Sequence, residues 1–403
     1  MASVGDRLVF PAPPSTYTRE TLKRYLCWIP WNEAVSPDKV DDERYAEGIP
    51  CMWLPAPRAA GVILFCHGNA EDLGMSFAFL RHMRDQFKMN VFAIEYPGYG
   101  LLNYMDPSEA AIKEVVLTAF RFVLDELKVA YEQIILFGRS IGSGPSIYLA
   151  SRFPVGGLIL VAAFASIREV IKSLAGGLVA RAFDERFPNL ALIGNVSCPT
   201  LFIHGEKDSL VPPSHSVSLF KQCRARKLLI TPPSMEHNTN LFTDASYLAV
   251  PAINFFGLPG YQQDTPPQVP AQFFEDGRKA FRARKHAKRK LQMGKDGQST
   301  TGSDIFQEWP WFIFCGCPTN RGYKFQGDTL SRSYEWELES RIKQHPPDST
   351  RNADFWSSDL NKSADKDAQA VSASRERWQH ANNSGKGRHN FDRDDDNKME
   401  EEY

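Results

Sequence analysis

The sequence has no long hydrophobic run and almost no net charge. No stretch approaches the roughly 20 apolar residues that a membrane-spanning helix needs. The N-terminus shows no basic region followed by an apolar run, and its second residue is Ala2, so we expect neither a secretory signal nor N-myristoylation. The formal net charge of −1 gives no overall attraction to nucleic acid, and no nucleic-acid partner is expected.

Cysteine is also scarce. The 403 residues contain seven cysteines, an odd number at scattered positions, whereas a secreted disulfide framework normally has an even number. Cys315 and Cys317 flank one glycine, which is not the spacing of a zinc site, and no second pair accompanies them. We therefore expect a reducing, cytoplasmic compartment and no disulfide framework. Nothing in the sequence indicates a metal, nucleotide or redox cofactor.

Residues 1–259 alternate short apolar runs with helical patterns. The strand candidates are mostly apolar on successive residues, as strands covered on both faces are. They span residues 62–66, 91–95, 134–138, 158–162, 201–204 and 227–231. The helix candidates between them span roughly residues 75–87, 107–127, 141–153, 214–221 and 240–256. This alternation predicts an α/β fold, with a mostly parallel central sheet and helices on both faces.

Residues 260–403 differ in composition and are predicted to form a mostly disordered tail. They are rich in Gln, Pro, Gly and charged side chains, which cannot bury enough apolar surface to offset the entropy of ordering. Two segments stand out within this tail, a basic one at 278–290 and an aromatic one with two cysteines at 309–317. The prediction is thus one folded domain, 1–259, followed by the tail.

The motif with the clearest chemical meaning is G-R-S-I-G at residues 138–142, between a predicted strand and a predicted helix. A serine on such a sharp turn has a strained backbone, and its neighbours two positions away must be small. Gly138 and Gly142 meet this requirement. The motif predicts Ser140 as a nucleophile and the backbone N–H of Ile141 as one donor of an oxyanion hole.

A serine hydroxyl needs a base, and in this type of fold the acid and then the histidine follow the serine in the chain. Asp208 lies just past the carboxyl end of a predicted strand, with Glu206 as a competing candidate. His237 lies in a polar loop after the last predicted strand and is the expected base. His204 is expected to be structural, and His215, at the start of a helix, is expected to be solvated.

The second oxyanion donor should come from the loop after an early strand. The apolar run at 62–66 leads into His67, Gly68 and Asn69. We expect the first two residues to set the turn and the Asn69 N–H to face the substrate oxygen. His67 itself is interpreted as an imidazole that fixes the loop by hydrogen bonding.

These motifs resemble those of a known family, the α/β-hydrolase domain-containing 17 group and its Bem46-like relatives. The resemblance covers roughly the first 260 residues. It includes H-G-N-A-E-D-L-G from residue 67, E-Y-P-G-Y-G from 95, G-R-S-I-G-S-G-P from 138, H-G-E-K-D from 204 and E-H at 236–237. Members of that group are membrane-associated serine hydrolases that remove palmitate from cysteines of cytosolic proteins. The resemblance implies the α/β-hydrolase fold and a protein S-acyl thioesterase that acts on palmitoyl-cysteine through an acyl-enzyme.

Two alternatives to a depalmitoylase stay open, a carboxylesterase or lipase-like hydrolase of small acyl esters and a non-catalytic scaffold. The interval at 163–195 is too short for a large cap domain. Its apolar side chains either line an acyl-binding groove or belong to the core. They are Phe164, Ile167, Leu174, Leu178 and Phe183.

The tail suggests a membrane anchor. Segment 278–290 holds eight Lys or Arg and no acid, and segment 309–317 adds aromatics together with Cys315 and Cys317 as possible lipidation sites. Basic helices attract anionic lipid, and aromatics settle at the headgroup level. The hypothesis is that 278–317 docks the protein peripherally on the cytosolic face of a membrane. The alternative is a solvated basic linker or nuclear-localisation patch.

Overall fold

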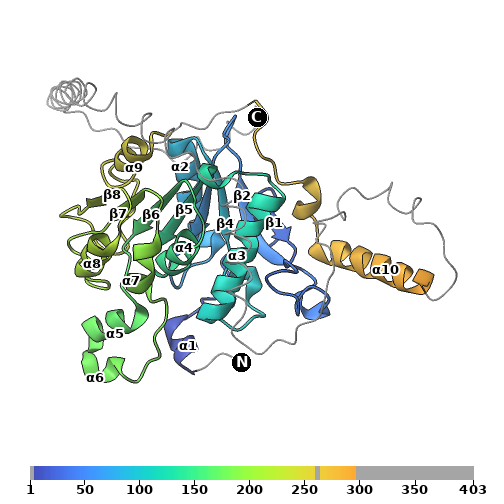
Figure 1. The fold of residues 1–403 in the computed structure, drawn as a ribbon, viewed down its shortest axis with the longest axis horizontal. Coiled ribbons are helices and arrows are strands. Elements are labelled where there is room, and N and C mark those ends of the chain that lie inside the picture. The colour runs from blue at the N-terminus through green and yellow to red at the C-terminus, as the bar shows by residue number, and fades with distance from the viewer. Residues whose placement is uncertain (1–3, 259–263, 296–403) are drawn as a thin grey trace, which may run out of the picture. The chain divides into compact units, whose positions relative to one another are not determined.

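The computed structural model describes residues 4–258 and 264–295, and their centre is one eight-stranded sheet (Figure 1). The spatial order of the strands is β1-β2-β4-β3-β5-β6-β7-β8, and β3 to β8 run parallel to one another. Their bounds are β1 Leu26–Ile29, β2 Ile49–Leu54, β3 Val62–Cys66, β4 Asn90–Ile94, β5 Ile134–Arg139, β6 Gly157–Val161, β7 Thr200–Ile203 and β8 Lys227–Ile230. This is the predicted α/β-hydrolase architecture, which is confirmed.

The six strands predicted from the sequence occur as β3 to β8, each end within one residue of its predicted position. Strands β1 and β2 were not predicted. They add an antiparallel pair at one side of the sheet, in which Cys27 lies opposite Cys51. β1 is only four residues long, and β2 contains Pro50, which normally argues against a strand. The sequence patterns therefore did not predict β1, because it is short, or β2, because it contains a proline.

Ten helices surround the sheet in the described part of the chain. Their bounds are α1 Val4–Val9, α2 Leu73–Phe87, α3 Glu109–Asp125, α4 Ser143–Ala150, α5 Ile167–Ala175, α6 Gly177–Ala180, α7 Asn189–Leu192, α8 Ser214–Gln222, α9 Ala249–Phe256 and α10 Gly277–Lys295. Helices α2 and α9 pack together over one face of the sheet, and α3, α4, α7 and α8 form a connected row over the other. Between β6 and β7 the chain forms only short helices and no large cap domain. None of the described helices is both long and apolar enough to cross a membrane.

The helix predicted at 240–256 is wrong in its first half, because α9 begins only at Ala249. Residues before it form turns in which polar side chains bind nearby backbone. Asn240 Oδ1 accepts from the Phe242 N–H at 3.0 Å, and Asp244 Oδ1 accepts from the Ser246 N–H at 2.8 Å. Such local hydrogen bonds compete with helix formation.

Part of the segment predicted as tail packs against the domain. The 3-10 helix η6, Ala271–Phe274, lies beside β1, and the Phe273 ring meets the Phe122 ring edge-on at 4.9 Å. Gly277 begins α10 in direct contact with the backbone of Glu47. This segment therefore borders an outer strand of the sheet, a place where an uncovered strand would invite unwanted pairing. Basic segment 278–290 lies within α10, and segment 309–317 with Cys315 and Cys317 lies outside the described residues.

Candidate active site

Ser140 occupies the turn between β5 and the helix that follows it. Its φ of 51° is left-handed, a strained conformation for a residue other than glycine. The turn is possible because two glycines allow close packing. A Cβ on Gly138 would lie 2.7 Å from the Cα of Ser143, and one on Gly142 would lie 2.7 Å from the His67 carbonyl oxygen. Gly138 and Gly142 thus have the structural role predicted for them, and Gly142 joins the serine turn to the end of β3.

The loops after β7 and β8 bring an acid and a base to this serine. His237 Nε2 lies 3.0 Å from Ser140 Oγ, and His237 Nδ1 lies 2.7 Å from Asp208 Oδ2. The distances allow a hydrogen-bonded chain from serine to imidazole to carboxylate. The structure therefore brings together the three side chains that the sequence pairs.

Asp208 is held as a carboxylate by several donors. Its Oδ1 accepts from the N–H groups of Leu210 and Val211 at 3.0 and 2.8 Å, and its Oδ2 also lies 3.2 Å from His204 Nε2. Burial alone would raise the pKa of Asp208, but hydrogen bonding to His204 and His237 and to the Val211 N–H holds it well below its ordinary value. The carboxylate is therefore ionised wherever His237 can act as a base.

The other candidates for the acid and the base have different surroundings. Glu206 is exposed, so it does not replace Asp208. His204 is fully buried between Ser216 Oγ and the Val211 carbonyl, each at 2.7 Å, which suits its expected structural role. The expectation that His215 is solvated is wrong, since only 6% of the residue is exposed. Its Nδ1 faces the Ala165 N–H at 3.3 Å, and its Nε2 lies 3.2 Å from Ser173 Oγ in α5.

Hydrogen bonds and an ion pair hold the loop after β3 in place. The N–H of Gly68 donates to Glu71 Oε1 at 2.7 Å, and the side chain of Asn69 bonds the Tyr99 hydroxyl at 2.6 Å and the Val9 carbonyl at 2.8 Å. Arg139, next to the nucleophile, pairs with Glu71 Oε2 at 3.2 Å. Because its side chain is already hydrogen-bonded, Asn69 could act on a substrate only through its backbone N–H. Its N–H and that of Ile141 remain the predicted oxyanion donors.

Two further residues of the site, Glu71 and Glu95, were not predicted, although both lie within motifs singled out in the sequence. Glu71 links the oxyanion loop to Arg139. Glu95 ends the β4 region and contacts the buried ring of His67. The sequence signal that could have identified these two residues is an acidic side chain within a motif of otherwise small and aromatic residues.

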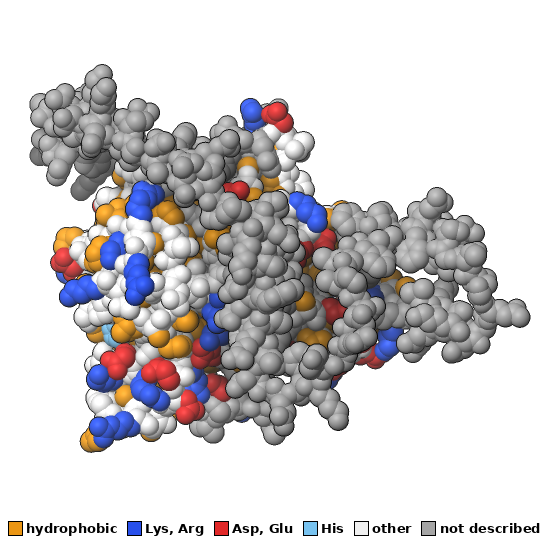
Figure 2. Space-filling model, viewed as in Figure 1, with side chains coloured by type: hydrophobic (Ala, Val, Ile, Leu, Met, Phe, Trp, Pro, Cys, Tyr) orange, Lys and Arg blue, Asp and Glu red, His pale blue; other side chains and the backbone are white. Residues whose placement is uncertain are grey.

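The apolar residues after β6 differ in their burial. Phe164 and Ile167 are buried and belong to the core. Leu174 in α5 and Leu178 in α6 are 54% and 83% exposed. Helices α5 and α6 lie at the lower left in Figure 1, where Figure 2 shows hydrophobic side chains among charged ones. Apolar surface is therefore present on the segment that directly follows the carboxyl end of β6.

The cysteines of the described region are all buried and free. Cys66 ends β3, next to the oxyanion loop, and burial raises the pKa of its thiol to about 12. The described residues also contain no group of three or more His, Cys, Asp or Glu side chains arranged to hold a metal ion. The possible lipidation sites Cys315 and Cys317 lie outside these residues.

The fold and the Ser140–His237–Asp208 arrangement define a serine hydrolase of the α/β-hydrolase class. Comparison with known families agrees. The family described as serine hydrolase (FSH1) matches residues 145–237, a span that includes Asp208 and His237 and begins just after Ser140. Among solved structures, Est1E from Butyrivibrio proteoclasticus with ferulic acid bound is 17% identical, with a TM-score of 0.43, over 51% of this chain and 94% of that one. Alpha/beta hydrolase domain-containing protein 10 from mouse is 18% identical, with a TM-score of 0.39, over 52% and 94%.

Sequence relatives narrow the class to a family. Alpha/beta hydrolase domain-containing protein aho-3 of Caenorhabditis elegans is 32% identical over 258 residues, which cover 61% of this chain and 76% of that protein. Protein 17B of Homo sapiens is 32% identical over 177 residues, 44% of this chain and 60% of that one. Protein 17C of Mus musculus is 33% identical over 174 residues, 43% and 53%. The chain belongs to this family of α/β-hydrolase domain-containing proteins, as the motifs predicted.

Proposed function

We propose that this serine hydrolase cleaves S-acyl cysteine thioesters of proteins, with palmitoyl-cysteine as the substrate. His237 Nε2 takes the Ser140 hydroxyl proton while Oγ attacks the thioester carbonyl. The C–S bond breaks, and the cysteine sulfur leaves with the proton from His237. Water activated by His237 then attacks the acyl-serine ester, which releases the fatty acid and restores Ser140. Asp208 orients His237 and stabilises its charged form in both the acylation step and the deacylation step.

The observation that carries this proposal is the exposed apolar surface of α5 and α6. Leu174, Leu178 and Val179 are large apolar side chains that solvent reaches, on a segment that starts where β6 ends. Exposed apolar surface beside a site commonly marks the place where an apolar group binds. A long acyl chain carried by a protein needs such a surface, whereas a small soluble ester does not.

The first experiment asks whether Ser140 is the nucleophile. A fluorophosphonate probe should label the wild-type protein and leave Ser140→Ala unlabelled. Hydrolysis of a palmitoylated peptide is then compared with that of short-chain esters. A protein that turns over short esters and leaves the palmitoyl thioester intact would be a carboxylesterase. A folded protein that neither labels nor hydrolyses would be a scaffold.

The second experiment tests the apolar surface itself. Burying half of each of two leucine side chains against an acyl chain contributes about 2 kcal/mol in total, or roughly 30-fold in kcat/KM. The double variant Leu174→Ser and Leu178→Ser should lose that factor on the palmitoyl peptide and keep its rate on a short ester. Val250→Ser, at an exposed apolar position on α9, is the control. Equal losses on both substrates would contradict the proposal.

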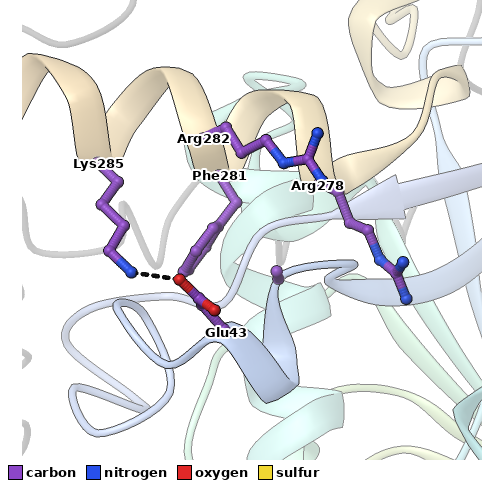
Figure 3. A pocket seen from close by; sticks show the side chains of 6 residues that line it. Glu43, Arg278, Phe281, Arg282 and Lys285 are labelled. Carbon is purple, nitrogen blue, oxygen red and sulfur yellow. Dashed lines mark hydrogen bonds and ion pairs between the residues drawn. The ribbon is translucent and has the colours of Figure 1, made fainter.

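We also propose that α10 brings the enzyme to an anionic membrane surface. Three of its cations are bound to acidic residues of the domain. Arg278 pairs with Glu47, Arg284 Nη2 lies 3.3 Å from Glu33 Oε2, and Lys285 Nζ lies 2.6 Å from Glu43 Oε1. Figure 3 shows the Lys285–Glu43 pair at an open pocket of about 520 Å³. We call Glu33, Glu43 and Glu47 the acidic patch.

The acidic patch makes membrane binding a competition. Exposed ion pairs contribute at most about 1 kcal/mol each, and a Lys or Arg near an anionic bilayer contributes a similar amount. Lipid headgroups can therefore replace the glutamates as partners of α10. Neighbouring Arg282 and Lys279 are exposed and add to the positive face of the helix.

Vesicle sedimentation tests this competition. Vesicles of phosphatidylcholine with about one-third phosphatidylserine should bind the full chain, and changing the acidic patch to glutamine should raise that affinity about tenfold. Changing three exposed glutamates that do not contact α10, Glu20, Glu132 and Glu206, is the charge-matched control. Equal affinity of the two triple variants would contradict the competition. Failure of the wild type to bind these vesicles would contradict the membrane partner.

A further inference from the structure

A fully buried pair of ionisable side chains lies behind the oxyanion loop. His67 Nε2 is 3.2 Å from Glu95 Oε1, and both side chains are 0% exposed. The other ring nitrogen, Nδ1, lies 2.8 Å from the Gly68 carbonyl oxygen. Both ring nitrogens thus face an oxygen that only accepts hydrogen bonds. The proposed catalytic steps use neither side chain.

The hydrogen bonds to Glu95 are those that a carboxylate accepts. Its Oε2 accepts from the Tyr17 hydroxyl at 2.8 Å and from the Leu73 N–H at 3.2 Å. Its Oε1 also lies 3.3 Å from the Tyr96 N–H. Three hydrogen-bond donors directed at the two oxygens favour the ionised form over the acid. A buried carboxylate needs a cation beside it, and His67 is the group in that position.

We propose that Glu95 keeps His67 as an imidazolium, and that this ring fixes the Gly68 carbonyl so that the Asn69 N–H faces the reacting acyl oxygen. A trans peptide is planar, and its C=O and N–H point in opposite directions. Drawing the Gly68 carbonyl toward His67 therefore turns the Asn69 N–H away from the ring. His67 is a positioning residue that acts through this peptide. The inference rests on the proposed hydrolase function, in which Asn69 is an oxyanion donor.

A neutral ring would not serve equally well. It has one N–H, so either the Gly68 carbonyl or the Glu95 carboxylate would face a ring lone pair. The Nε2–H is also poorly aligned with Glu95 Oε1, so the contact depends mainly on attraction between charges. The Tyr96 ring, which stacks on His67 at 3.9 Å, leaves the imidazole little room to turn.

The charged groups around His67 favour the imidazolium. Burial lowers the pKa of His67, but the Glu95 carboxylate, the nearby charge of Glu71 and the Gly68 carbonyl outweigh it, so the pKa is raised. Glu71 is itself paired with Arg139. The tyrosines in contact with this group, Tyr17, Tyr96 and Tyr99, all have raised pKa values and stay neutral. Raising the pH should therefore remove the His67 proton only above the ordinary range of histidine.

Nitrogen NMR of the histidine rings tests the charge without any need for activity. In the wild-type protein at about pH 7, just above the ordinary pKa of histidine, both nitrogens of His67 should be mostly protonated. His67→Gln assigns the signals. In Glu95→Gln one ring nitrogen should lose its proton at the same pH. A singly protonated His67 in the wild type would overturn the proposal.

Kinetics test the positioning. His67→Gln should lower kcat by about 10- to 100-fold with KM nearly unchanged, because an oxyanion donor acts mainly in the transition state. His82→Gln, at an exposed histidine of α2, should leave kcat unchanged. An unchanged kcat in folded His67→Gln would overturn the role.

If His67→Gln does not fold, the pH dependence of the wild-type protein still tests the proposal. Its kcat should fall as the pH rises, with the same midpoint as the NMR titration of His67, and a different midpoint would overturn the proposal. Failure of the hydrolase proposal would look different, since the wild type would then lack fluorophosphonate labelling while the NMR result stood.

Discussion

Gly142 joins the serine turn to the end of β3, and replacing it with alanine should separate the two. A Cβ at this position would lie 2.7 Å from the carbonyl oxygen of His67 and closer still to that of Cys66. Both neighbours are backbone atoms, so no side-chain rotation can make room. The strand end and the nucleophile turn must therefore move apart.

The distances set the size of the effect. Ordinary van der Waals contact for a carbon atom begins near 3.4 Å, so the backbone must shift by about 1 Å. Overpacking of this kind typically costs about 1–3 kcal/mol of stability, and a rigid backbone obstacle places Gly142→Ala near 3 kcal/mol. A misplacement of about 1 Å at a catalytic site lowers kcat by about 100-fold.

Urea unfolding and the rate of fluorophosphonate labelling measure the two effects separately. Gly177→Ala, at the first residue of α6, is the matched control, because a Cβ there meets no atom within 4 Å. It should change neither stability nor labelling. Wild-type stability and labelling in Gly142→Ala would refute the reasoning that this contact sets the geometry of the site.

Two further predictions concern the reacting side chains. Ser140→Gly and Ser140→Ala should both fail to label, but the glycine variant should be more stable by about 1 kcal/mol in urea unfolding, because a φ of 51° strains alanine and not glycine; equal stability would contradict strain at this residue. Asp208→Asn should lower kcat by about 10³- to 10⁴-fold with little change in KM, because His237 loses the partner that sets its tautomer. The pKa of Asp208 is lowered by folding, so its contribution to stability is complete above the unfolded value and is lost as the pH falls through the acid range. The stability difference between wild type and Asp208→Asn should therefore shrink at acid pH, and a difference that stays constant would contradict the assignment.

Much of the fold and of the site could be predicted from the sequence because the signals are local. Buried parallel strands are continuous apolar runs, and β3 to β7 each contain one, whereas β8 at the edge of the sheet is half-buried. Ser140 was identified from small residues at fixed spacing, and Asp208 and His237 from their order after it. These features depend only on residues close together in the chain.

What could not be predicted depends on contacts between distant segments. Tyr17 reaches Glu95 across 78 positions, and no local pattern marks that hydrogen bond. His215 has the surroundings of a solvated helix start in sequence, yet α5 covers it. Composition alone likewise does not reveal that η6 and the start of α10 pack against the domain.

The burial of Cys66 affects whether an acyl group on Ser140 can transfer to a cysteine of the enzyme itself. Cys66 pairs in the sheet with Gly138, two residues before Ser140, and a reactive thiolate in this region could capture the acyl group by transfer from oxygen to sulfur, so that turnover would stall. The Cys66 thiol stays protonated, because burial raises its pKa to about 12, and the other described cysteines are buried as well. In the described part of the chain, Ser140 therefore has no competing sulfur nucleophile, and mild alkylating reagents should leave the five described cysteines of the folded enzyme unmodified.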